Sequence, residues 1–311
     1  MAAESAAYAR ASIAKGSKSF AAASRLLPPA VRDDVARLYA WCRHADDVID
    51  GQTLGHGETL VADPAERLAD LTARTDAALA GAATGNPIFD GFGHVARAHG
   101  ITAPLAHDHL AGFAMDVDGR TYDTLDGLFA YCYGVAGVVG VMMALTLGVR
   151  PADTDTLDRA CDLGIAFQLT NISRDIIADA AIGRVYLPTT LLRAEGVPPT
   201  PEAVRDPAHA PAVFRVAEAL LDAADRYYAS AEVGIRRLPM RTAWSIASAR
   251  AVYRAIGSRR RAAGPAGLAL RVGTGKTAKL ALVALSALSA ARSDGRHRPR
   301  PALWTRPRHE A

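Results

Sequence analysis

Long runs rich in alanine, leucine and arginine, separated by glycine and proline clusters, are the feature that most constrains how this chain of 311 residues can fold. Apolar residues recur in these runs at helical spacing, and the alternating Val/Ile pattern of half-buried strands is absent. The sequence therefore predicts an all-α fold. We expect helices over residues 2–15, 29–50, 64–80, 86–99, 103–116, 125–147, 153–180, 211–238, 242–263 and 277–291.

The predicted breaks at residues 51–63, 195–210 and 264–275 are too short to join independent domains. We therefore expect one domain over residues 1–291 and a loose basic, proline-rich tail over residues 292–311. The tail is either a solvated end or a segment attracted to an anionic membrane leaflet, and its sequence leaves both interpretations open. Nucleic acid is not an expected partner, because the tail offers only one aromatic residue, Trp304, among its arginines.

Composition places the chain in the cytoplasm, with contact to the inner face of the membrane as the open alternative. Half of the residues are hydrophobic and 22% are charged, which is typical of a soluble or peripherally bound globular protein. The three cysteines are far apart in apolar stretches, so neither a disulfide framework nor a zinc site is predicted. Residues 128–149 are uncharged and long enough to cross a bilayer, but their glycine and tyrosine content favours a buried core helix.

A first set of polar residues is expected to form a stripe along the predicted helix 29–50. Tyr39, Arg43, Asp46 and Asp50 fall within roughly 60° of one another at 3.6 residues per turn. Two carboxylates four residues apart repel each other unless a cation lies between them. Magnesium suits this position, because it prefers oxygen ligands and completes its shell with water and phosphate.

A second set repeats this geometry along the predicted helix 153–180. Gln168, Asn171, Asp175 and Asp179 are spaced by three, four and four residues, and Arg174 is adjacent. An amphipathic surface helix would also place polar residues on one face, so either stripe alone is ambiguous. The two together favour a shared site.

Two metal-binding stripes in an apolar helical bundle suit a substrate with a diphosphate head and a hydrocarbon tail. Metal ions would stabilise the diphosphate as a leaving group, and the apolar interior would hold the chain and shield a carbocation from water. Phosphoryl transfer is the alternative chemistry. Residues 275–277 (GKT) are similar to the end of a phosphate-binding loop, but Leu270 replaces the required glycine and no preceding strand is predicted.

At these residues the sequence resembles the phytoene/squalene synthase family, and within it the bacterial phytoene synthases. The resemblance rests on residues 16–20 (GSKSF), 38–50 (LYAWCRHADDVID), 131–140 (YCYGVAGVVG), 166–175 (AFQLTNISRD), 183–188 (GRVYLP) and 252–254 (VYR). It implies a single isoprenoid-synthase helical bundle with a central active-site cavity. It also implies a prenyltransferase that joins two prenyl diphosphates head to head through a cyclopropylcarbinyl diphosphate.

The resemblance implies roles for individual residues as well. The expected catalytic residues are Asp46, Asp50, Asp175, Asp179 and Tyr253. The expected ligands of magnesium, or of manganese in its place, are Asp46, Asp50, Asn171, Asp175 and Asp179. The expected substrate contacts are Ser17, Lys18, Ser19, Tyr39, Arg43, Gln168, Asn171, Arg174 and Arg184.

The expected reaction converts two geranylgeranyl diphosphates to phytoene through prephytoene diphosphate, without NADPH, in carotenoid biosynthesis. Small side chains at Ala36 and Ser24 favour the longer substrate if they line the end of the pocket. The alternatives are a squalene or dehydrosqualene synthase acting on farnesyl diphosphate, a terpene cyclase or chain elongase, and a non-catalytic assembly protein of the same fold. The glycine-rich residues 273–277 depart from the family pattern, and they leave open how that segment closes the pocket.

Overall fold

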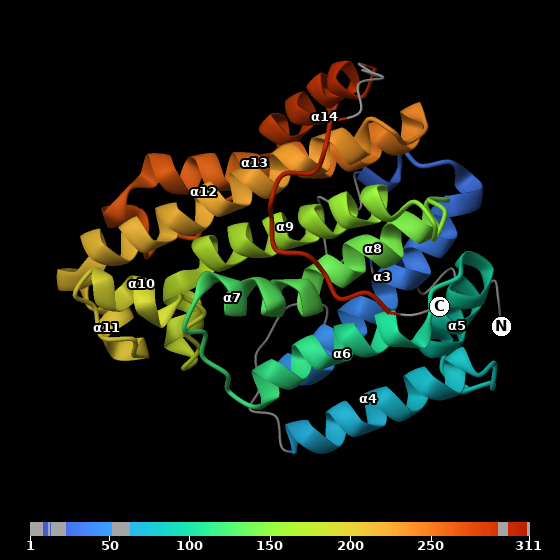
Figure 1. The fold of residues 1–311 in the computed structure, drawn as a ribbon, viewed down its shortest axis with the longest axis horizontal. Coiled ribbons are helices and arrows are strands. Elements are labelled where there is room, and N and C mark those ends of the chain that lie inside the picture. Colours follow the sequence, from blue (N-terminus) through green and yellow to red (C-terminus); the bar gives the residue numbers. More distant parts are fainter. Residues whose placement is uncertain (1–8, 12, 14–22, 52–62, 292–297, 310–311) are drawn as a thin grey trace.

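The computed structural model describes residues 9–11, 13, 23–51, 63–291 and 298–309. This part of the chain contains helices and no strand, which confirms the all-α prediction (Figure 1). The α-helices are α3 (Pro29–Asp50), α4 (Pro64–Leu79), α5 (Pro87–His99), α6 (Ala103–Val117), α7 (Leu125–Cys132), α8 (Val138–Thr146), α9 (Thr154–Ala181), α10 (Thr189–Ala194), α11 (Pro201–Arg205), α12 (Ala210–Ile235), α13 (Met240–Ala263) and α14 (Lys276–Ala291). A π-helical segment, η1 (Tyr133–Gly137), joins α7 to α8, and 3₁₀ turns occur at η2 (Pro207–His209) and η3 (Pro265–Gly267).

Local capping explains several helix boundaries. The side chain of Asn86 accepts a hydrogen bond from the backbone N–H of Ile88 at the start of α5, and Gly100 ends this helix in the left-handed conformation. Asp153 caps α9 in the same way through the N–H of Thr156. The short helices α10 and α11 were not predicted, because one or two turns give too little apolar periodicity to detect.

Helix α9 lies in the middle of the bundle, with α8 and η1 packed on it together with α12 and α13 (Figure 1). Close packing with α8 and η1 depends on glycine. A Cβ atom at Gly140 would lie 2.2 Å from the carbonyl oxygen of Ala160, and one at Gly164 would lie 2.2 Å from that of Ala136. Gly140 at the end of the YGVAGVVG segment and Gly164 on α9 therefore let two helix backbones approach closely, which fixes the position of α9.

The apolar segment that could span a membrane by length and composition is the continuous run Leu125–Thr146, formed by α7, η1 and α8, in which Asp126 is the one charged residue. Of its most apolar window, 67% is buried inside the protein. Its apolar side chains pack against α6 and α9, which agrees with the interpretation as a core helix.

Residues 298–309 are docked on the protein instead of forming a loose end. This segment crosses the bundle from the side of α14 toward α6 (Figure 1). Arg300 binds Asp162 on α9, the ring of Trp304 lies 5.5 Å from that of Tyr133, and His309 contacts a carboxylate of α6. The prediction of a loose tail was wrong for these residues, because carboxylates on α9 and α6 supply partners for its basic side chains.

Candidate functional site

The first polar stripe lies on α3 as predicted, and its arginine is tied to its carboxylates. Arg43 lies 2.8 Å from Asp46 through Nη1 and donates to Asp47 Oδ1 from Nε and Nη2 at 3.0 and 2.8 Å. The guanidinium thus offsets the repulsion between neighbouring acidic side chains. Asp50 is the last residue of α3, and its side chain is outside the described part of the structure.

Tyr39 continues this stripe one turn toward the start of α3. Burial raises the pKa of Tyr39 to about 12, so its hydroxyl remains a hydrogen-bond donor at neutral pH. Ala36 is 1% exposed and packs with Ala9, Ile13 and Tyr39. Its small size therefore accommodates the N-terminal residues, and the structure does not place it at the end of a substrate pocket.

The second stripe lies on α9. The guanidinium of Arg174 donates from Nε to both carboxylate oxygens of Asp175, at 2.9 and 3.1 Å, and also binds through Nη2. Asn171 donates weakly to Gln168 Oε1 at 3.4 Å. The side-chain oxygen of Asn171 is buried and lacks a hydrogen-bond partner among the described residues. A buried carbonyl oxygen without a donor is costly, which indicates a position adapted to an external cation or donor.

Tyr253 on α13 connects the two stripes. Its ring stacks on Phe167 with centroids 4.1 Å apart. Burial raises the pKa of Tyr253, while the charge of Arg174 lowers it and that of Asp175 raises it. Tyr253 is also among the groups that raise the pKa of Tyr39. The tyrosine is therefore near Arg174 and Asp175 of the second stripe and near Tyr39 of the first.

The last carboxylate of the second stripe is at the end of α9. The chain turns back after this helix, so that the backbone N–H of Arg184 donates to the carbonyl oxygen of Asp179 at 2.9 Å. A cavity of about 10 Å³, enough for about one water molecule, is lined by Asp179, Arg184 and Tyr186 among others. The predicted substrate contact Arg184 is thus beside the predicted metal ligand Asp179.

Asp116 of α6, which was not among the predicted residues, joins two tyrosines of the resemblance motifs. Its carboxylate accepts hydrogen bonds from Tyr131 at 3.0 Å and from Tyr186 at 2.8 Å, and the two rings stack with centroids 5.1 Å apart. Helical spacing gives no signal for such a contact, because the three residues belong to separate segments of the chain.

Arg271 was missed as well. Its Nε lies 3.6 Å from Asp175 Oδ1, although 79% of its side chain is exposed. It belongs to the segment between η3 and α14, which the sequence shows only as a break. A single arginine in a loop has no periodic pattern that could reveal its partner.

The donor set fits magnesium in its chemistry. The residues that would bind it carry carboxylate and amide oxygens, and the unpartnered oxygen of Asn171 is among them. Within the described part of the chain, no three acidic, histidine or cysteine side chains converge on one point. Diphosphate oxygens and water would therefore complete the shell, as Mg²⁺ commonly requires.

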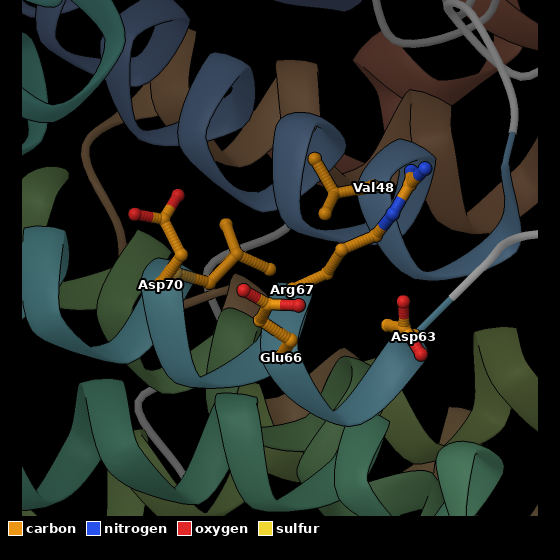
Figure 2. A pocket seen from close by; sticks show the side chains of 6 residues that line it. Val48, Asp63, Glu66, Arg67 and Asp70 are labelled. Carbon is orange, nitrogen blue, oxygen red and sulfur yellow. The ribbon is translucent and has the colours of Figure 1, made fainter.

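A larger cavity, of about 350 Å³, lies between α3 and α4 and is outside this site (Figure 2). It is lined by Val48, Asp63, Glu66, Arg67, Asp70 and Leu71. Val48 is two residues from Asp46, so it points to the other side of α3 from the stripe. The predicted contacts Ser17, Lys18 and Ser19 lie outside the described residues.

The helical bundle and its two acidic stripes are the features expected of a prenyl diphosphate synthase. Comparison with known proteins gives the same class. The family model described as squalene/phytoene synthase matches residues 13–279. The chain belongs to this family.

Two curated relatives narrow the comparison. The 15-cis-phytoene synthase of Paracoccus sp. is 52% identical over 299 residues, which are 96% of this chain and 96% of the relative. The phytoene synthase of Pseudescherichia vulneris is 50% identical and covers 96% and 97% of the two chains. Among solved structures, a dehydrosqualene synthase bound to a ligand is similar, with a TM-score of 0.79 and 27% identity over 92% of this chain and 96% of that chain.

Proposed function

We propose that this protein joins two molecules of geranylgeranyl diphosphate head to head, through prephytoene diphosphate, to give phytoene for carotenoid biosynthesis. The observation that carries the proposal is the arrangement of the α3 and α9 stripes around Tyr253, with a buried, unpartnered amide oxygen at Asn171. The relatives at 50% and 52% identity are phytoene synthases, which supports phytoene over squalene as the product.

In this proposal each stripe supplies carboxylates that bind the metal and an arginine that binds the diphosphate. Asp46 and Asp50 on α3, and Asn171, Asp175 and Asp179 on α9, would hold Mg²⁺, or Mn²⁺ in its place. Bound metal would neutralise charge on the departing diphosphate.

Two arginines and two tyrosines would act on the substrates directly. Arg43 and Arg174 are within hydrogen-bond distance of the stripe carboxylates, so their guanidinium groups are placed beside any diphosphate bound there. Tyr39 remains protonated at neutral pH and could donate to the same groups. The ring of Tyr253 stacks on that of Phe167, and a prenyl chain could pack against this aromatic pair.

The direct test is incubation with labelled geranylgeranyl or farnesyl diphosphate and Mg²⁺, with and without NADPH, followed by analysis of hydrocarbons and released diphosphate. We expect phytoene from the C20 substrate at the same rate with or without NADPH. Predominant C30 product would replace the proposal with squalene or dehydrosqualene synthesis. Absence of both products and of diphosphate release would favour a non-catalytic assembly protein.

We further propose that the protein makes peripheral contact with the inner face of the membrane, and that α14 makes this contact instead of the basic tail. Leu280, Leu285 and Leu288 on α14 are 71%, 62% and 64% exposed. Lys276 and Lys279 are at the start of the same helix, and residues 233–293 contain no acidic residue. An apolar face with basic neighbours suits an anionic lipid surface.

Co-sedimentation with vesicles of phosphatidylcholine, with or without phosphatidylglycerol, tests the surface on α14. Serine at Leu280, Leu285 and Leu288 should abolish binding to the anionic vesicles. Serine at the exposed Ile182 and Met240 is the matched control and should leave binding unchanged. Equal binding by both variants would contradict the proposal, as would a wild-type protein that stays in solution.

A further inference from the structure

Arg260 is a buried cation that the reaction scheme does not use. It lies on α13, two turns after Tyr253, and only 1% of it is exposed. Its guanidinium donates to three backbone carbonyls: Gly267 at 2.7 Å, Leu270 at 3.0 Å and Arg174 at 2.6 Å. Burying a cation costs free energy, and carbonyl oxygens offset this cost only in part. The position of Arg260 therefore calls for an explanation beyond packing.

One of these hydrogen bonds connects Arg260 to the backbone of the second stripe. The carbonyl of Arg174 belongs to α9, 86 residues away from Arg260 in sequence. The side chain of Arg174 holds Asp175 through its own hydrogen bonds. Arg260 thus fixes the backbone at the residue that orients a predicted metal ligand.

The other two hydrogen bonds hold the segment that carries Arg271. Arg260 binds Gly267 and Leu270 just before it, and Arg259 donates to the carbonyl of Gly273 at 2.7 Å just after it. Leu268 anchors the start of this segment in the core, but Leu270 is 65% exposed, so packing holds the part next to Arg271 only weakly. Arg259 and Arg260 therefore hold in place a loop whose arginine lies 3.6 Å from Asp175.

Arg260 also contributes its charge to this end of the site. Burial lowers the pKa of Arg260, the charge of Asp175 raises it and that of Arg174 lowers it, but a guanidinium stays protonated under ordinary conditions. A fixed positive charge in a poorly hydrated place acts over a longer range than one in water. Its field would favour an anion bound beside Asp175.

We propose that Arg260 is a positioning residue for the diphosphate end of the active site. It sets the separation between Arg174 on α9 and the loop that carries Arg271, and it supplies a buried positive charge next to the backbone of both. The inference deepens the proposed function, on which it rests, by assigning part of the recognition of diphosphate to a residue that does not touch the ligand.

Binding of inorganic pyrophosphate with Mg²⁺, measured by calorimetry, separates positioning from a general structural role. Arg260→Met should weaken this binding about tenfold, and Arg260→Lys should weaken it less because it keeps the charge. Arg159→Met is the matched control. Arg159 is also 1% exposed and donates to backbone carbonyls of Ser230 and Arg298, but it is about 24 Å along α9 from Asp175.

The control variant should lower the melting temperature while its pyrophosphate affinity stays within about twofold of wild type. Wild-type affinity in a folded Arg260→Met protein would overturn the proposal. If Arg260→Met does not fold, the pyrophosphate affinities of Arg260→Lys, Arg271→Ala and the double variant are compared instead. Positioning through the loop predicts losses that are less than additive, whereas fully additive losses would overturn it.

Product analysis keeps the two proposals distinguishable. If pyrophosphate affinity falls in the Arg260 variants but the wild-type protein yields no phytoene, the proposed reaction is refuted and the role of Arg260 stands. Wild-type protein that makes phytoene, with pyrophosphate affinity unchanged in both Arg260 variants, would refute only the positioning role.

Discussion

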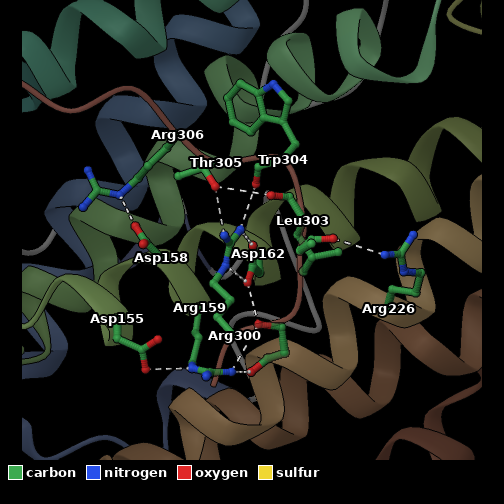
Figure 3. Close-up of polar contacts among 12 residues, drawn as sticks. Asp155, Asp158, Arg159, Asp162, Arg226, Arg300, Leu303, Trp304, Thr305 and Arg306 are labelled. Atoms are coloured by element: carbon green, nitrogen blue, oxygen red, sulfur yellow. Dashed lines mark hydrogen bonds and ion pairs between the residues drawn. The ribbon is translucent and has the colours of Figure 1, made fainter. Parts of the chain in front are cut away.

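Arg300 and Asp162 form a bidentate ion pair between the tail and the central helix α9 (Figure 3). Nε and Nη2 of the arginine lie 2.8 and 2.6 Å from the two carboxylate oxygens, and the aspartate is fully buried. The hydroxyl of Ser230 donates to the same carboxylate at 2.6 Å. A carboxylate in this position needs a cation, and residues 298–309 bring one to it.

Removing Arg300 should therefore destabilise the fold strongly. Arg300→Met leaves the carboxylate of Asp162 buried without its cation, and we expect urea denaturation to show a loss of about 3–5 kcal/mol. Arg308→Met is the control, because Arg308 is half exposed and shares Asp158 with Arg306. Its loss should stay below about 1 kcal/mol. Asp162→Asn added to Arg300→Met should recover much of the stability, and equal losses in the two single variants would contradict this account.

His109 should make stability depend on pH between about 6.5 and 4. Burial lowers the pKa of His109 to about 4, although the hydrogen bond between its Nδ1 and the carbonyl of Gly134 raises it. The unfolded chain takes up the proton first as pH falls, so the stabilisation present above 6.5 is lost on the way to 4. The loss is about 3 kcal/mol for this group.

Urea denaturation across this pH range measures that loss. His109→Gln should flatten the profile, since glutamine does not titrate. His107→Gln, at an exposed site on the same helix, should retain the wild-type profile. Identical profiles for wild type and His109→Gln would contradict the prediction.

Asp175→Asn should abolish the first ionisation of substrate. The substitution keeps the shape of the side chain but removes the charge that faces Arg174 and Arg271, and we expect diphosphate release to fall by at least about 100-fold. Asp70→Asn, in the cavity between α3 and α4, should retain wild-type activity. Accumulation of prephytoene diphosphate in Asp175→Asn would assign the carboxylate to the second step instead.

Ala36→Trp should destabilise the protein before it alters chain-length preference. Ala36 is packed against Ala9 and Ile13, so a larger side chain would overfill this contact at a cost of about 1–3 kcal/mol. We expect a lower melting temperature and slower turnover of both C15 and C20 substrates. Ala98→Trp, on an exposed face of α5, is the control. A clean shift to C30 product at unchanged stability would restore the pocket-depth interpretation.

Much of the fold and both stripes could be predicted because their signals are local. Helical spacing places Asn171, Asp175 and Asp179 on one face whatever packs around them, and the structure keeps them on α9. Long helices such as α3 and α12 were predicted within a few residues for the same reason. Short helices and the π-helical turn were not, because they depend on contacts that the surrounding sequence does not contain.

The residues that support the site could not be predicted in this way. Asp116 joins tyrosines 15 and 70 residues away, and Arg260 binds a carbonyl 86 residues away. Each such contact exists only after the helices have packed, so no spacing along the chain encodes it. Resemblance to a family brought Tyr253 into the site, and the structure supplies the physical reason through its closeness to Arg174, Asp175 and Tyr39.

Local periodicity in the chain is thus sufficient for the long helices, the two stripes and the kind of cation that their oxygens suit. The position of residues 298–309 could be decided only by tertiary packing. From composition, the basic tail could be either a solvated end or a segment attracted to a membrane. Asp162 has no charge partner within its own helix turn, and its burial follows from the packing of α9 against α12. A buried carboxylate is stable only with a cation beside it, and here the cation comes from Arg300, 138 residues further along the chain.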